Sequence, residues 1–280
     1  MKKVISALLV VLCTFSLCFS SYAAQGENQY DASDKIVIGY LYTDADYQNL
    51  SEKEQLAEET AQKLSLHSTT ASTSPSRVIP SAKTYTIPIE NFKQEKTNWC
   101  GAACVKQTLS FHRSVNGVST ALPSQGTIAT KLGIYSSGGA SSDKMAQVLN
   151  EYRSTYGFTN RTYSTADLTD KSDAYNWLYP RLRSAIVNQT YAPIVLLETG
   201  RLSGIQRYYE AGEHCRHYNT IGGIRETTDL QNNHLYLKEI QTVDPHYNSQ
   251  FYGKHWDEGS TVYQSMLLAD SNGANKVLIY

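Results

Sequence analysis

Apolar positions follow a helical period in the first half of the chain and form short strand-like runs in the second. A helix is expected from near Cys100 to about His112, since Trp99 and Gly101 are poor residues for a helix interior. Its apolar face consists of Ala103, Val105, Leu109 and Phe111. Further helices are expected at 51–66, 142–156 and 173–188, and strands at 35–42, 85–89, 192–198, 215–224, 235–243 and 276–280. Helices followed by antiparallel strands indicate an α+β fold.

Local signals refine three of these elements. Ser51 and Glu54 have the spacing of a capping box, which starts the first helix at Ser51. Pro180 is expected to break the helix at 173–188 or to start its second part. The stretch 114–141 is rich in Gly and Ser and is interpreted as loops.

The chain divides into three parts. Residues 1–23 have two lysines, an apolar run and small residues before a cleavage point after Ala23, which is typical of a secretory signal peptide. Residues 24–83 hold a strand–helix segment and a linker rich in Ser, Thr and Pro. This part is either a pro-segment that inhibits the protein by covering its groove, or a spacer or small partner-binding element. The folded domain is expected at 84–280.

Composition narrows the function classes. Hydrophobic residues make up 41% and charged residues 18% of the chain, which are values of a globular protein. The net charge is −1, and −3 without Lys2 and Lys3 of the leader. This balance gives no sign of nucleic-acid binding or of a basic membrane-binding patch, so we expect neither partner after removal of the leader.

The candidate chemistry starts at Cys100. A thiol at a helix N-terminus meets free N–H groups and the positive end of the helix dipole, which stabilise the thiolate. The thiolate is the form that attacks a carbonyl in acyl transfer. Gln94 lies six residues upstream, where its amide could donate to the oxyanion together with the Cys100 N–H.

The other candidate residues lie on two consecutive strands. His217 stands near the start of the strand at 215–224, and Asp244 follows the strand at 235–243. A hairpin of these strands would bring His217 and Asp244 to the same end. An imidazole backed by a carboxylate can take the thiol proton and is held in the right tautomer.

These segments together resemble the papain-like cysteine peptidases. They are most similar to the bacterial peptidases that remove double-glycine leaders from bacteriocins. The resemblance covers roughly residues 84–280 and rests on the following segments: Gln94, Trp99-Cys100-Gly101-Ala102-Ala103, His217-Tyr218 with Gly222-Gly223, and Asp244-Pro245. It implies a papain-like fold, in which a helical part carrying the nucleophile packs on an antiparallel sheet.

The resemblance also implies a role for each candidate residue. Cys100 would be the nucleophile and His217 the general base, with Asp244 orienting His217 and Gln94 in the oxyanion hole. Cys104 and Asn219 depart from the family pattern, in which a small residue and Val or Ile are common. Leader processing coupled to transport is not implied, because no transporter domain accompanies the peptidase-like part.

The remaining Cys and His residues have structural interpretations. Cys104 and Cys215 are either a disulfide pair that leaves Cys100 free, or a buried core residue and a free thiol. His214 and His217 lie at a loop-to-strand boundary without a CxxC motif, so we expect no zinc site and no other metal or cofactor. His246 is expected on a surface loop.

The sequence therefore predicts a secreted cysteine peptidase that acts on a peptide or protein. Three alternatives stay open: a transglutaminase-like acyltransferase, an amidase of cell-wall peptides, and a catalytically silent binding module. Rapid thiol labelling at Cys100 would separate an enzyme from a binding module, and incorporation of a lysine donor would identify a transferase.

Overall fold

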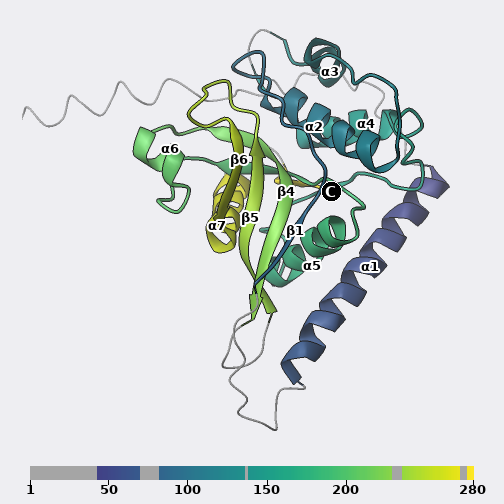
Figure 1. Cartoon of the computed structure of the whole chain (residues 1–280), viewed down its shortest axis with the longest axis vertical. Helices are drawn as coiled ribbons and strands as arrows, with labels where there is room; N and C mark the ends of the chain where they lie inside the picture. The colour runs from purple at the N-terminus through teal and green to yellow at the C-terminus, as the bar shows by residue number, and fades with distance from the viewer. Residues whose placement is uncertain (1–42, 70–81, 136–137, 229–234, 272–275) are drawn as a thin grey trace, which may run out of the picture.

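The computed structural model describes residues 43–69, 82–135, 138–228, 235–271 and 276–280 (Figure 1). The helices are α1 (Asp44–Thr69), α2 (Cys100–Val115), α3 (Gln125–Leu132), α4 (Ser142–Glu151), α5 (Ala174–Val187), α6 (Gln206–Ala211) and α7 (Gly259–Ser271). The strands are β1 (Lys83–Thr86), β2 (Thr165–Ala166), β3 (Ile194–Glu198), β4 (Arg216–Thr228), β5 (Leu235–Asp244), β6 (Gly253–Glu258) and β7 (Leu278–Ile279). The strand expected at 35–42 and the signal peptide expected at 1–23 lie outside the described residues.

The described strands form one antiparallel sheet in the order β2-β7-β3-β4-β5-β6, with β1 paired to β4. Strands β4 and β5 are the expected hairpin, with Thr220 opposite Val243. Strand β3 pairs with the other side of β4, so β4 lies in the interior of the sheet. This combination of helices and antiparallel strands confirms the α+β class.

Helices cover the sheet from several directions. Figure 1 shows α2, α3 and α4 grouped at one end, α6 and α7 on one side of the long strands, and α5 with α1 on the other. The core joins these layers through fully buried side chains such as Leu109 and Phe111 of α2, Val195 of β3, Ile240 of β5 and Met266 of α7. The start of α2 thereby lies against β4, where the chemistry was predicted.

Helix α1 begins at Asp44, and its predicted start at Ser51 is wrong. The Thr43 hydroxyl accepts from the Asp46 N–H at 3.3 Å, and Asp46 Oδ2 accepts from the Thr43 N–H at 2.8 Å. This reciprocal pair is the capping box of the helix. Glu54 instead pairs with Arg181 of α5, so its side chain is drawn away from the helix start by a tertiary contact.

Two further predictions are corrected. The stretch 114–141 contains helix α3, whose Ser124 hydroxyl accepts from the Thr127 N–H at 3.0 Å and whose end is Gly133 in the left-handed conformation. The Ser and Gly that indicated loops are therefore caps. Helix α5 runs through Pro180 without a break, because the buried Leu178 and Leu182 on either side fix both halves against the core.

No helix in the part of the chain that the structure describes combines the length and apolar character needed to cross a lipid bilayer.

Candidate active site

Cys100 is the first residue of helix α2, as predicted. The preceding Trp99 provides no side-chain cap, so the first turn leaves N–H groups free beside the thiol. Gly101 allows this turn to pack closely, because a Cβ there would lie 2.7 Å from the Cβ of Ala140. A residue larger than glycine would push the nucleophile segment away from the chain that leads into α4.

His217 and Asp244 lie side by side at one end of the β4–β5 hairpin. His217 Nε2 is 2.9 Å from Asp244 Oδ1, and both side chains are buried. With Nε2 bound to Asp244, Nδ1 is the ring nitrogen left for Cys100. The structure thus brings together three of the four residues predicted for the site.

The three groups shift one another's pKa values toward charged forms. Burial raises the pKa of Cys100, but a hydrogen bond and the charge from His217 outweigh it and lower this pKa below its usual value. Burial lowers the pKa of His217, yet the Asp244 carboxylate and the bond to Cys100 hold it well above the usual range. The pKa of Asp244 falls, because His217 and its hydrogen bonds outweigh burial. The arrangement therefore favours a thiolate beside an imidazolium.

Helix α6 supplies two supports for Asp244 that the sequence did not indicate. The buried Tyr208 hydroxyl donates to Asp244 Oδ2 at 2.6 Å. Arg207 Nη2 lies 3.7 Å from the same oxygen, while Arg207 Nη1 donates to Asp257 Oδ1 at 2.6 Å. The carboxylate is therefore held through Oδ2 by helix α6, while Oδ1 faces His217.

His246 lies inside the site, so the expectation of a surface position is wrong. Its side chain is only 3% exposed, and its ring centroid is 5.2 Å from that of His217. Its backbone N–H donates to Asp244 Oδ1 at 2.9 Å. Burial and the neighbouring His217 lower the pKa of His246 to about 4, so its ring is neutral beside the imidazolium. The turn after Pro245 brings the ring back over the end of the hairpin.

Gln94 lies in the same region but its amide is engaged with its own loop. Nε2 donates to the carbonyls of Lys96 and Thr97, both at 2.8 Å, and Oε1 is buried without a hydrogen-bond partner among the described residues. The Gln94 N–H donates to the Pro245 carbonyl at 2.6 Å, which joins this loop to the end of β5. To donate to an oxyanion, the amide must exchange one of the two carbonyl bonds.

Cys100, Cys104 and Cys215 are free thiols in the structure. Cys104 is buried in α2 and donates to the Tyr218 carbonyl at 3.3 Å, which matches the core-residue interpretation. Cys215 lies 3.3 Å from the Thr199 hydroxyl. Burial raises the pKa of both thiols, so Cys100 alone among the three has a lowered pKa.

Comparison with known proteins agrees with this geometry. The model of the Peptidase_C39 like family matches residues 86–266, which span the segment from β1 to α7 and include all four predicted site residues. Neither the curated proteins nor the solved structures give a match. The matched range is more than half of the chain and confirms the resemblance on which the predictions rest. The chain belongs to the Peptidase_C39 like family.

Proposed function

We propose that the protein is an exported cysteine peptidase with Cys100 as its nucleophile and a papain-like arrangement of helices and sheet. The observation that carries the proposal is the His217–Asp244 bond of 2.9 Å, together with the lowered pKa of Cys100 beside the same imidazole. Family membership supports cysteine peptidase chemistry in general. Export rests on the sequence of residues 1–23, as does removal of the leader after Ala23.

The reaction follows from the charge state of the site. The Cys100 thiolate attacks the scissile carbonyl carbon, and the carbonyl electrons move to oxygen to form an oxyanion. The Cys100 N–H at the start of α2 and the Gln94 amide donate to this oxyanion. As the carbonyl re-forms, the C–N bond breaks, and the His217 imidazolium gives its proton to the leaving amine.

The second half of the reaction regenerates the thiolate. His217, now neutral, takes a proton from water, and the hydroxide attacks the thioester carbonyl. Collapse of the second tetrahedral intermediate releases the carboxylic acid and returns the Cys100 thiolate beside the imidazolium. Asp244 keeps the His217 ring oriented in both steps, because its hydrogen bond to Nε2 leaves Nδ1 turned toward the sulfur.

The test is mass spectrometry of a broad peptide mixture incubated with the chain from residue 24 onward. Wild type is compared with Cys100→Ala and with Cys215→Ala, which removes a second half-buried thiol near the site. Cleavage by wild type and Cys215→Ala, but not by Cys100→Ala, is expected. Equal cleavage by wild type and Cys100→Ala would refute the mechanism.

Two added measurements separate the alternatives. Iodoacetamide should label Cys100 far faster than Cys104 or Cys215, and equal slow labelling would favour a silent binding module. A lysine donor in the peptide mixture should not be incorporated, whereas its incorporation would identify an acyltransferase. A mixture that includes cell-wall peptides distinguishes an amidase of those substrates.

A further inference from the structure

Helix α1 packs on the domain through a face that is more polar than a typical core-facing helix. Over residues 44–64, where the structure describes its side chains, the buried positions are Asp46, Lys53, Ala57, Thr60 and Leu64, which recur at helical spacing. Two of these five side chains carry charge, and only one is a large aliphatic group. A helix with so few apolar contacts must be held mainly by polar interactions with the surface beneath it.

Lys53 is the centre of these interactions. Its Nζ donates to the Tyr280 carbonyl at 2.9 Å, to the Ser164 hydroxyl at 2.7 Å and to the Thr162 carbonyl at 3.3 Å. The same nitrogen lies 3.9 Å from the centroid of the Tyr280 ring and 5.4 Å from that of Tyr191. Three acceptors and two aromatic rings form a site shaped for a primary amino group.

Two acidic residues of α1 flank this site and meet arginines of the domain. Asp46 pairs with Arg153 and also accepts from the Thr162 hydroxyl at 3.0 Å. Glu54 pairs with Arg181 of α5. Asp46 and Glu54 are eight residues apart, which is about 12 Å along a helix. The domain thus recognises an acid–lysine–acid pattern on one helix through complementary charges.

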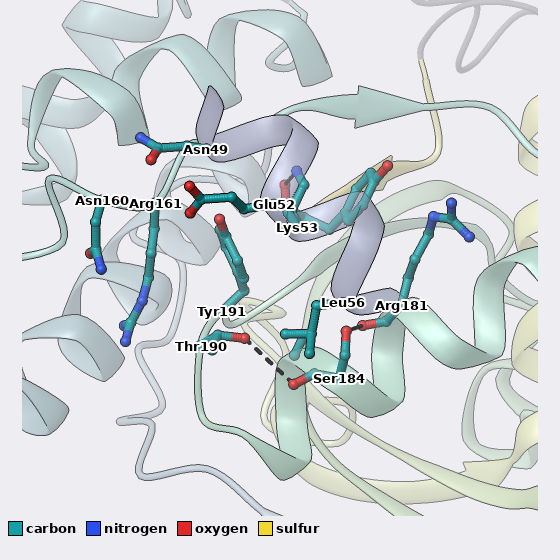
Figure 2. A pocket seen from close by; sticks show the side chains of 12 residues that line it. Asn49, Glu52, Lys53, Leu56, Asn160, Arg161, Arg181, Ser184, Thr190 and Tyr191 are labelled. Carbon is teal, nitrogen blue, oxygen red and sulfur yellow. Dashed lines mark hydrogen bonds between the residues drawn. The ribbon is translucent and has the colours of Figure 1, made fainter. Parts of the chain in front are cut away.

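The seam between α1 and the domain is not filled like a core. A cavity of about 200 Å³ lies at this seam and is lined by Lys53 and Leu56 of α1 and by Tyr191 and Arg181 of the domain. Figure 2 shows the side chains that line it. Within the part of the chain that the structure describes, the buried Arg181 Nε has no hydrogen-bond partner. Polar contacts around a partly open seam are typical of an interface between separable parts.

This seam is remote from the supports of the candidate active site. Helix α1 lies along α5, whereas α6, which carries Tyr208, lies on the opposite side of the sheet in Figure 1. The polar anchors of α1 reach α5, the segment 153–164 and Tyr280. None of these anchors involves Cys100, His217 or Asp244.

We propose that Thr162, Ser164, Tyr191 and Tyr280 form a receptor for a lysine-bearing helix, and that α1 stays bound there as a separate piece when the chain is cut between residues 70 and 81. A cut in the Ser/Thr/Pro-rich segment then produces a two-chain protein instead of discarding the helix. This differs from inhibition by a groove-covering segment 24–83, and it does not rest on the proposed peptidase activity.

The experiment uses the chain with a site for a specific protease placed between residues 70 and 81. Cys100→Ala in the same chain prevents any self-cleavage. The protein is folded first, then cut, and passed over a size-exclusion column with mass spectrometry of each fraction. The fragment containing α1 is expected to elute with the domain. Elution of the fragment apart from the domain would overturn the proposal.

Lysine recognition is tested with fluorescent peptides of residues 43–69 that exchange into the cut protein. The Lys53→Met peptide should bind on the order of 100-fold more weakly. Methionine lacks the amino group of Lys53, so the buried acceptors and charges that face this group lose their partner. Lys63→Met changes an exposed lysine of the same helix and should bind like wild type. All peptides meet the same Cys100→Ala domain, so a folding defect of a variant domain cannot mimic the result. Equal affinity of the Lys53→Met and wild-type peptides would refute the lysine receptor.

Discussion

Two buried polar clusters of this protein hold their charges in opposite ways. At the candidate active site, His217 faces the Asp244 carboxylate and the Cys100 sulfur, and its pKa rises well above the usual range despite burial. At the α1 seam, Lys53 faces carbonyl and hydroxyl oxygens, and burial lowers its pKa to about 7 although Glu54 opposes the shift. A buried cation keeps its charge when a counterion lies against it, and loses much of it among neutral acceptors.

The two ways of holding a buried cation suit different roles. The ion pairs of the site are suited to a reaction that needs a stable thiolate and imidazolium around neutral pH. The neutral acceptors around Lys53 are suited to recognition that changes with pH. The contrast can be tested by removing the Asp244 carboxylate from the first cluster and the Lys53 amino group from the second.

The largest effect is expected from removing the counterion of the site. Asp244→Asn should lower kcat on the order of 1,000-fold, because the neutral amide leaves the buried His217 imidazolium without its counterion. The measurement is steady-state hydrolysis of a peptide identified in the cleavage mixture. Asp143→Asn, at an exposed carboxylate of α4, serves as the matched control. A loss of less than tenfold in Asp244→Asn would show that the site does not depend on this ion pair.

A smaller loss is expected at the oxyanion. Gln94→Ala should lower kcat about 100-fold, as for the loss of one oxyanion donor. Gln125 is the control, since its buried amide holds the same loop through the Lys93 carbonyl at 2.7 Å and the Glu95 N–H at 3.1 Å. Gln125→Ala should cost much less in kcat. Equal losses in the two variants would mean that Gln94 acts only by holding the loop.

The sequence predicted those parts of the site that depend on neighbouring elements. His217 and Asp244 stand at the ends of two consecutive strands, so hairpin pairing alone brings them together. The start of α2 at Cys100 was equally local. The α+β class followed from the order of helices and strands, whereas the pairing of β7 between β2 and β3 joins distant segments and was not foreseen.

The parts that the sequence did not predict depend on distant contacts. Tyr208 reaches Asp244 across 36 positions of the chain from a six-residue helix between Gly204 and Gly212, a stretch that resembles a loop in its composition. His246 was expected on the surface because it follows a strand. The polar anchors of α1 were likewise hidden, since Lys53 has an ordinary place in a charged helix until its distant acceptors are known.

Tyr208 provides a milder test of the same ion pair. Tyr208→Phe removes one hydrogen bond to the charged Asp244, for which a loss of about tenfold in kcat/KM is expected. This bond lowers the pKa of Asp244, so its removal raises that pKa, and activity should fall at a higher pH on the acidic side. Tyr209→Phe alters an exposed neighbour on the same helix and should change neither value. A tenfold loss without movement of the acidic limb would indicate a purely structural role.

The smallest effect is expected from pH at the α1 seam. The pKa of Lys53 falls from 10.5 to about 7 in the folded protein, through burial and the nearby Arg181 against the opposing Glu54. The unfolded or detached helix therefore binds more protons than the docked one between these pH values, and docking strengthens as pH rises. For a shift of this size, the affinity of the 43–69 peptide for the cut protein should rise about fivefold from pH 7 to pH 8. Below pH 7 both states hold the proton, so the dependence should level off. The Lys53→Met peptide should lose the pH dependence, while the Lys63→Met peptide should keep it.

The tyrosines that face Lys53 remain protonated throughout, because burial raises the pKa of Tyr191 to about 12 and raises that of Tyr280 as well. An affinity that falls with rising pH would show that the seam holds Lys53 as a stable ammonium, as the catalytic cluster holds His217, and would remove the contrast between the two clusters.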